Sequence, residues 1–154
     1  MFTDLIVALL AGLVGTTFMT AMMLAGKQLG LPAIDVHSLL GYVTRTDRRT
    51  SIGYIGHWLL GALFAIGYVV IFRATTGNLL LRGIIIGIVH WLLVGGLFAF
   101  APTFHAGMRA GTVKAAGPYM LNTLGWIGFI GGMAGHIVFG ATVAVIYGLF
   151  SGGL

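Results

Sequence analysis

The side chains best suited to chemistry in this sequence are three histidines inside long apolar runs, His57, His90 and His136. An ionisable group at such depth in a membrane is costly, and by default it faces the interior of a helix bundle. An imidazole there can bind a metal ion or a haem iron, or it can relay a proton. It can also stay neutral and donate to a backbone carbonyl or a threonine, which is a purely structural role. Both interpretations stay open at the level of sequence.

Two of these histidines belong to a repeated segment. Residues 56–68 align without gaps on residues 135–147, and each copy carries His, Gly, Ala and Tyr at matching positions. On a helix these four positions fall within about 80° of arc and form one stripe. The stripe consists of His57, Gly61, Ala65 and Tyr68 in the first copy and of His136, Gly140, Ala144 and Tyr147 in the second. If the two helices run in the same direction, both histidines lie at one depth.

The repeated stripe supports two interpretations. Gly and Ala four residues apart form the small-residue surfaces through which transmembrane helices pack closely, with His and Tyr bonding locally. Alternatively, His57 and His136 flank a flat prosthetic group such as haem b, and the Gly, Ala and Tyr positions of the stripe line its site. With His90, the two histidines would instead form a three-imidazole metal site.

The sequence lacks the patterns that indicate an enzyme. It has no cysteine, and its three acidic residues, Asp4, Asp35 and Asp47, lie outside the expected spans and too far apart to suggest a carboxylate pair. A Gly-rich phosphate loop and a nucleophile elbow are both missing from the sequence. No catalytic residue is therefore assigned, and the sequence argues against hydrolase and nucleotide chemistry.

Composition identifies lipid as the main solvent of the chain. Of its 154 residues, 58% are hydrophobic and 7% are charged, against roughly 25% charged residues in soluble domains. Four apolar segments reach the roughly 20 residues that a helix needs to cross a bilayer. They are residues 5–24, 52–72, 79–101 and 124–150. We therefore predict one all-α integral membrane domain over residues 1–154, a four-helix transmembrane bundle with Trp58, Trp91 and Trp126 in an interface belt or against lipid.

The first and third spans also agree loosely with each other. Residues 9–12, Leu-Leu-Ala-Gly, resemble residues 80–83, Leu-Leu-Arg-Gly. Together with the stripe on the second and fourth spans, this predicts two similar helical hairpins related by an axis along the membrane normal.

Positive charge predicts the orientation of the bundle. The connections between spans one and two and between spans three and four carry six Lys and Arg residues, whereas the opposite side carries only Arg73 and Arg82. By the positive-inside rule the six-charge side is cytoplasmic, and both termini face outward. The formal charge of +5 lies at the ends of apolar segments, which favours contact with anionic lipid headgroups over nucleic acid. We expect a multi-pass protein of a bacterial inner membrane.

Several short motifs are distributed along nearly the whole chain. They are Ala11-Gly12 with Thr17 and Met19-Thr20, Gly30-Leu31-Pro32 with Asp35 and Leu40-Gly41, the two repeated segments, and residues 87–92 around His90. In these motifs the chain resembles a bacterial family of small four-span membrane proteins known only as a domain of unknown function. The resemblance implies a four-helix integral membrane fold and implies no activity.

Three functional hypotheses are compatible with these residues. The first is a non-catalytic bundle that serves as an accessory or assembly subunit of a larger membrane complex, or as a scaffold, with other membrane subunits or further copies of itself as partners. The second is a redox or metal-binding protein that holds a haem b or a metal ion through His57 and His136, with or without His90. The third is a small proton-coupled transporter in which His90 relays protons.

Overall fold

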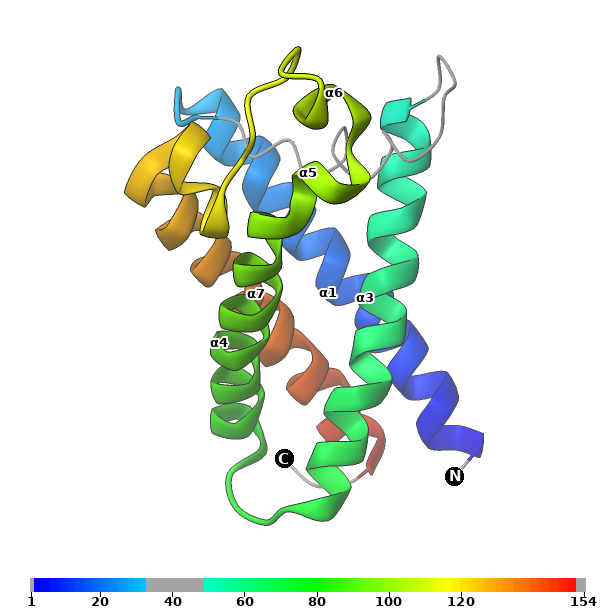
Figure 1. The fold of residues 1–154 in the computed structure, drawn as a ribbon. Coiled ribbons are helices and arrows are strands. Elements are labelled where there is room, and N and C mark those ends of the chain that lie inside the picture. The colour runs from blue at the N-terminus through cyan, green and yellow to red at the C-terminus, as the bar shows by residue number, and fades with distance from the viewer. Residues whose placement is uncertain (1, 33–48, 152–154) are drawn as a thin grey trace.

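The computed structural model describes residues 2–32 and 49–151, and these ranges contain helices and turns but no strand (Figure 1). Four long helices dominate: α1 (Phe2–Gln28), α3 (Arg49–Ala74), α4 (Leu79–Leu97) and α7 (Leu121–Ser151). All four are long and apolar enough to cross a membrane. The prediction of an all-α protein with four packed apolar helices is confirmed, and the chain is a multi-span membrane protein.

Short helices extend α4 and precede α7. They are the 3-10 turn η1 (Phe98–Phe100), α5 (Ala101–Phe104), α6 (Ala106–Arg109) and the 3-10 turn η2 (Pro118–Met120). The backbone leaves the helical region at Gly125, which has a φ of 60° that favours glycine. This kink lies close to the expected start of the fourth span at residue 124, although α7 begins at Leu121.

Local capping explains the turn between α3 and α4. The Asn78 side chain accepts a hydrogen bond of 2.8 Å from the backbone N–H of Leu81, which is the role of an N-cap. The Arg82 guanidinium donates back to the carbonyl of Phe72 at the end of α3 and reaches the Gly77 carbonyl at 3.4 Å. Arg82 therefore reaches the end of the bundle from inside the third span, as a snorkelling side chain does.

Close glycine contacts join the helices within each hairpin. A Cβ on Gly12 of α1 would lie 2.5 Å from the Gly61 carbonyl oxygen and 2.8 Å from the Ala65 Cβ on α3. A Cβ on Gly83 of α4 would collide with the Gly140 carbonyl oxygen on α7 and lie 2.6 Å from the Ala144 Cβ. The Gly and Ala positions of both stripes are thus surfaces of close helix packing.

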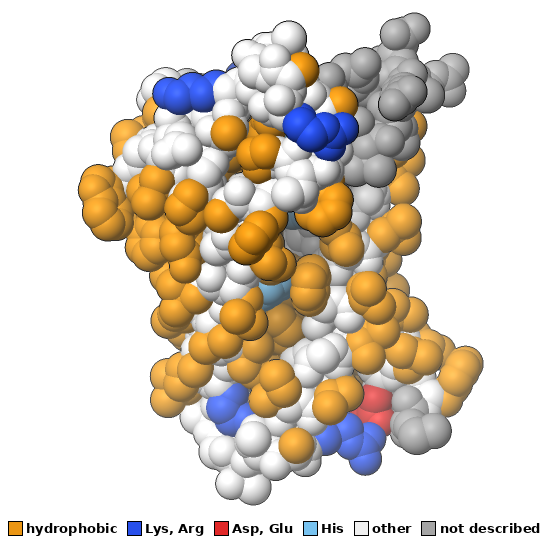
Figure 2. Space-filling view, viewed as in Figure 1, with side chains coloured by type: hydrophobic (Ala, Val, Ile, Leu, Met, Phe, Trp, Pro, Cys, Tyr) orange, Lys and Arg blue, Asp and Glu red, His pale blue; other side chains and the backbone are white. Residues whose placement is uncertain are grey.

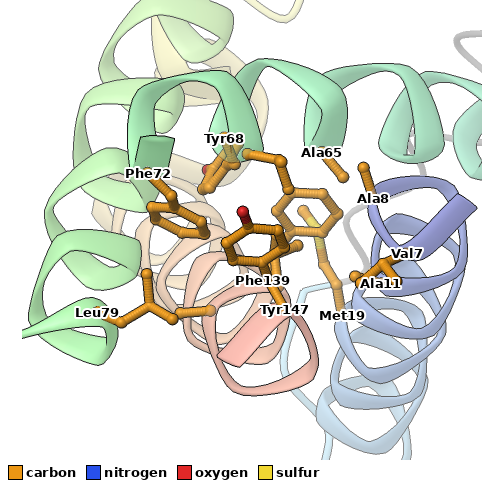
Figure 3. Close-up of a cluster of buried hydrophobic side chains, with 13 residues drawn as sticks. Val7, Ala8, Ala11, Met19, Ala65, Tyr68, Phe72, Leu79, Phe139 and Tyr147 are labelled. Carbon is orange, nitrogen blue, oxygen red and sulfur yellow. The ribbon is translucent and has the colours of Figure 1, made fainter. Parts of the chain in front are cut away.

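The buried hydrophobic core lies mainly in the half of the bundle nearest the start of α1 and the end of α7. Figure 3 shows its side chains. Tyr68 and Phe72 from α3 meet Phe139 and Tyr147 from α7, and Val7, Ala8 and Ala11 of α1 close the side of this cluster. The rings of Tyr68 and Phe139 are edge to face at 5.4 Å. The core is therefore assembled from the first, second and fourth spans, with Leu79 added from α4.

Charges lie at both ends of an apolar band (Figure 2). The end at which α1 begins and α7 ends carries Arg73, Arg82 and Asp4, with Arg73 paired to Asp4. Asp4, which the sequence placed just outside the first span, lies in the first turn of α1. Of the six basic residues assigned to the opposite side, Arg45 and Arg48 lie outside the described residues.

Candidate functional site

The three histidines inside the spans line one cavity of about 140 Å3. His57 comes from α3, His90 from α4 and His136 from α7, and α1 contributes Thr16 and Met19 to the wall. Most other lining side chains are apolar or aromatic, and four glycines complete the wall. Side chains from all four long helices thus meet at one place inside the bundle.

His136 has a defined orientation. Its side chain is buried, and its Nδ1 lies 2.8 Å from the Gly132 carbonyl oxygen one turn earlier in α7. Because a carbonyl oxygen can only accept, Nδ1 carries the hydrogen and donates it. In the neutral ring, Nε2 then holds the lone pair and can accept a hydrogen bond or bind a metal.

His90 stands beside His136. The two ring centroids lie 4.8 Å apart and the rings are nearly perpendicular, at 89°. The Nδ1 of His90 lies 3.1 Å from the hydroxyl of Tyr68 on α3. The Phe64 ring, also on α3, covers His90 at a centroid distance of 4.4 Å.

Trp91 is a member of the site that sequence reasoning missed. It was expected at a membrane interface or against lipid, but it is 2% exposed and its ring lies 5.1 Å from that of His136. Its indole nitrogen Nε1 is buried and has no hydrogen-bond partner among the described residues. An indole N–H can only donate a hydrogen bond, and burying such a donor without an acceptor costs free energy.

A signal for the burial of Trp91 was present in the sequence. The buried residues of α4 are Leu79, Gly83, Gly87, Trp91 and Gly95, which are spaced by four throughout. Glycines at this spacing mark the ridge of α4 that packs into α7. A Cβ on Gly132 of α7 would collide with the Trp91 indole. The large side chain of Trp91 thus fills the space that the glycine leaves.

The cavity opens sideways between α3 and α4. Leu60 and Phe64 of α3 and Val94 of α4 line the cavity, and Leu60 and Phe64 are also exposed. Figure 2 shows a histidine side chain visible at the bottom of a hollow on this face, between hydrophobic side chains. This face lies within the apolar band, so in a membrane the opening would face lipid.

The predicted site residues divide between the cavity and the packing surfaces. His57, His90, His136 and Gly61 line the cavity. Ala65, Gly140 and Ala144 lie in the close helix contacts, and Tyr68 and Tyr147 belong to the buried core. The structure thus brings the histidines together but uses most of the remaining stripe to pack helices.

The arrangement of the described residues does not resemble a preformed metal centre. Among them, no group of three or more His, Cys, Asp and Glu side chains is placed to hold a metal ion. Two imidazoles on opposite faces of a haem would have ring centroids about 6 Å apart, given metal–nitrogen bonds of roughly 2 Å. The 4.8 Å separation of His90 and His136 is shorter than that. These two histidines are not spaced as a sandwiching pair, and the pair that the sequence predicted, His57 and His136, stays a prediction.

The comparisons with known proteins identify no relative. No protein-family model, curated protein or solved structure matches the chain significantly. The resemblance to a bacterial family of small four-span proteins therefore stays a prediction, and what the chain is shown to be is a small multi-span membrane protein with four apolar helices packed together.

Proposed function

We propose that this chain is a non-catalytic membrane protein that holds a small ligand in the histidine-lined cavity between its helices. One observation carries the proposal: three intramembrane histidines from three different helices line a single cavity. Side chains that are costly to place in a membrane are usually functional there. Concave apolar sites with a few convergent polar groups are the usual form of ligand pockets.

The lining supports binding more than catalysis. Among the described residues, the polar side chains that line the cavity are the three histidines, Trp91 and Thr16. The hydroxyl of Thr16 already donates to the Gly12 carbonyl at 2.8 Å. Such a site can recognise a ligand, but it presents no activated nucleophile of the usual kinds.

The test is native mass spectrometry of the full-length protein extracted in mild detergent. We expect a bound mass in the wild-type protein that is lost in Val94→Phe, which fills the cavity. Leu93→Phe makes a similar change at a neighbouring position on α4 that is 65% exposed. We expect this control to retain the bound mass. The same bound mass in Val94→Phe would contradict the proposal.

Two further features complete the proposal. The hairpins α1–α3 and α4–α7 are two copies of one unit, supported by the matching glycine contacts of Gly12 and Gly83.

The bundle serves as an accessory or assembly subunit, or as a scaffold, in a bacterial inner membrane. Its exposed apolar faces support contacts with other subunits or further copies. Cross-linking before extraction would then recover a complex larger than the single chain, and recovery of the single chain alone would argue against this role.

The proposed orientation places the basic connections in the cytoplasm, and the chain has no cysteine to interfere with a labelling test. Thr76 lies in the exposed turn between α3 and α4, and Lys114 lies in the exposed connection before η2. In intact cells an impermeant maleimide should label Thr76→Cys and spare Lys114→Cys. The reverse pattern would invert the orientation.

Haem b or a metal ion is the second candidate ligand. The cavity of about 140 Å3 is too small to enclose a haem, whereas the His136 geometry favours a metal ion. A histidine that binds a metal usually donates its other N–H to a carbonyl, as Nδ1 of His136 does to Gly132. A visible spectrum and metal analysis of protein from its native membrane test this candidate. It requires a Soret band or stoichiometric metal that His57→Ala and His136→Ala remove.

A proton-coupled transporter is the third candidate, supported by the contacts of His90 with Tyr68 and His136.

A further inference from the structure

The cavity has the size of one small ring. Its volume is about 140 Å3, and a protein cavity of about 150 Å3 lined by apolar side chains is large enough to bind benzene. Pockets for drug-sized ligands are larger, at about 300–1,000 Å3. A ligand confined to the cavity is therefore one ring, and any longer part of it must leave through an opening.

The position of the opening determines what surrounds the part of the ligand that does not fit in the cavity. It lies between α3 and α4, beside the exposed side chains of Leu60 and Phe64, on the apolar face of the bundle. A chain that leaves the cavity there enters the hydrocarbon region of the bilayer. The ligand then combines a ring head with an apolar tail, and it reaches the site by lateral diffusion in the membrane.

Trp91 and His136, which both line the cavity, determine what the ring must carry. The Nε1–H of Trp91 is a buried donor that lacks a partner in the described part of the chain and has almost no accessible surface, so an oxygen on the ring would satisfy it once the indole turns slightly toward the cavity. The Nε2 of His136 is an acceptor, because Nδ1 donates to Gly132. A ring carbonyl can accept from Trp91, and a ring hydroxyl can in addition donate to His136.

We propose that this cavity binds the head ring of a membrane-soluble quinone or quinol, with its apolar tail leaving between α3 and α4. The inference rests on the proposed ligand-holding function and names the chemical class of the ligand. Trp91 is the positioning donor in both redox forms of the ring, and His136 accepts from the hydroxyl of the reduced form. No electron transfer by this chain is part of the proposal.

The experiment titrates the full-length protein in nanodiscs with a benzoquinone that carries one isoprenoid unit. Isothermal titration calorimetry measures binding after subtraction of empty nanodiscs, because such a probe also partitions into lipid. We expect saturable binding with one site per chain. Trp91→Phe, which keeps the ring but removes the N–H, should weaken binding about fivefold, the loss expected for one hydrogen bond.

Two filling variants and one control complete the test. Val94→Phe and Leu60→Phe narrow the cavity from α4 and α3 and should each abolish saturable binding, whereas Leu93→Phe should bind as the wild type does. Two filling variants are used so that the result stands if one of them fails to fold. Heat equal to that of empty nanodiscs, or equal binding by the filling variants, would overturn the inference.

The two proposals fail separately. If native mass spectrometry finds a bound mass that Val94→Phe removes, and the quinone probe does not bind, the cavity holds another ligand and only the quinone assignment is wrong. If the wild-type protein carries no bound mass and the probe does not bind, the ligand-holding function is wrong as well.

Discussion

The contact of α1 with α7 and the contact of α3 with α4 are two of the places where the hairpins meet, and they differ. The first is closed: a Cβ on Gly15 of α1 would lie 2.9 Å from the Phe139 ring of α7, and Met19 packs against Gly135. The second is open, because His90 of α4 meets α3 through Tyr68 and Phe64 while the cavity lies beside them. If the hairpins are two copies of one unit, these two contacts occupy equivalent places.

The proposed alignment of the hairpins offers a physical reason for the difference. Where α1 has Gly15 and Met19, α4 has Ile86 and His90. A glycine lets two helices approach closely, whereas a β-branched side chain at the same place holds them apart. Ile86 is partly buried and packs against the core. The closed contact thus stabilises the bundle, and the open one leaves room for a ligand.

The largest expected effect comes from emptying the closed contact. Phe139 is 2% exposed and contacts the rings of Tyr68 and His90, so Phe139→Ala should lower the free energy of unfolding by about 3 kcal/mol. Phe64→Ala removes the same side chain at the open contact, where Phe64 is 41% exposed, and should cost less than about 1 kcal/mol. Unfolding by sodium dodecyl sulfate in mixed micelles, followed by circular dichroism, measures both. Equal losses would remove the distinction between the contacts.

Placing the α4 residue at the matching position of α1 tests whether side-chain volume causes the difference between the closed and the open contact. Gly15→Ile places the α4 residue at the equivalent position of α1 and should force α1 away from Phe139, with a loss of about 2 kcal/mol. A Cβ on Gly67 of α3 would meet open space, with no neighbour within 4 Å, so Gly67→Ala should be neutral or stabilise by up to about 1 kcal/mol. The same unfolding assay applies. A neutral Gly15→Ile would show that side-chain volume does not explain the closed contact.

A smaller effect is expected from the hydrogen bond across the open contact. Tyr68→Phe removes the hydroxyl that lies 3.1 Å from Nδ1 of His90 and should cost about 0.6 kcal/mol, the typical value for an interhelical hydrogen bond in a membrane. Tyr147→Phe, at the equivalent position of α7, removes a longer contact of 3.4 Å with Asp4 and should change stability less. A larger loss in Tyr147→Phe would contradict the assignment of Tyr68 as the bond that holds α3 to α4.

The smallest effect is expected at the end of the bundle. Arg73 and Asp4 form an exposed ion pair between α3 and α1. Exposed ion pairs contribute little and are screened by salt. Arg73→Gln should therefore leave the unfolding midpoint nearly unchanged in 0.15 M salt, about the physiological ionic strength. A large, salt-independent loss would mean that the pair takes part in holding α1 against α3.

Much of the fold and part of the site could be predicted from local patterns. The apolar runs predicted four helices, and the rarity of His57, His90 and His136 within them indicated an interior position. Trp91 was missed because the local sequence, an aromatic residue next to a histidine, is the same whether the tryptophan lies at a membrane interface or in a buried core. The roles of Gly140 and Ala144 stayed open for a similar reason, since small residues make room equally for a helix or for a ligand.

The sequence by itself determined the solvent of this protein and the number of its spans, because hydropathy and run length act locally along the chain. Only the tertiary structure decided which helices touch and which stand apart, because that depends on side-chain volumes facing one another across sequence-distant helices. Gly83 meets Gly140, Trp91 fills the space over Gly132, and α3 and α4 leave a cavity beside three histidines. The cavity is the result of those pairings, and no single helix encodes it.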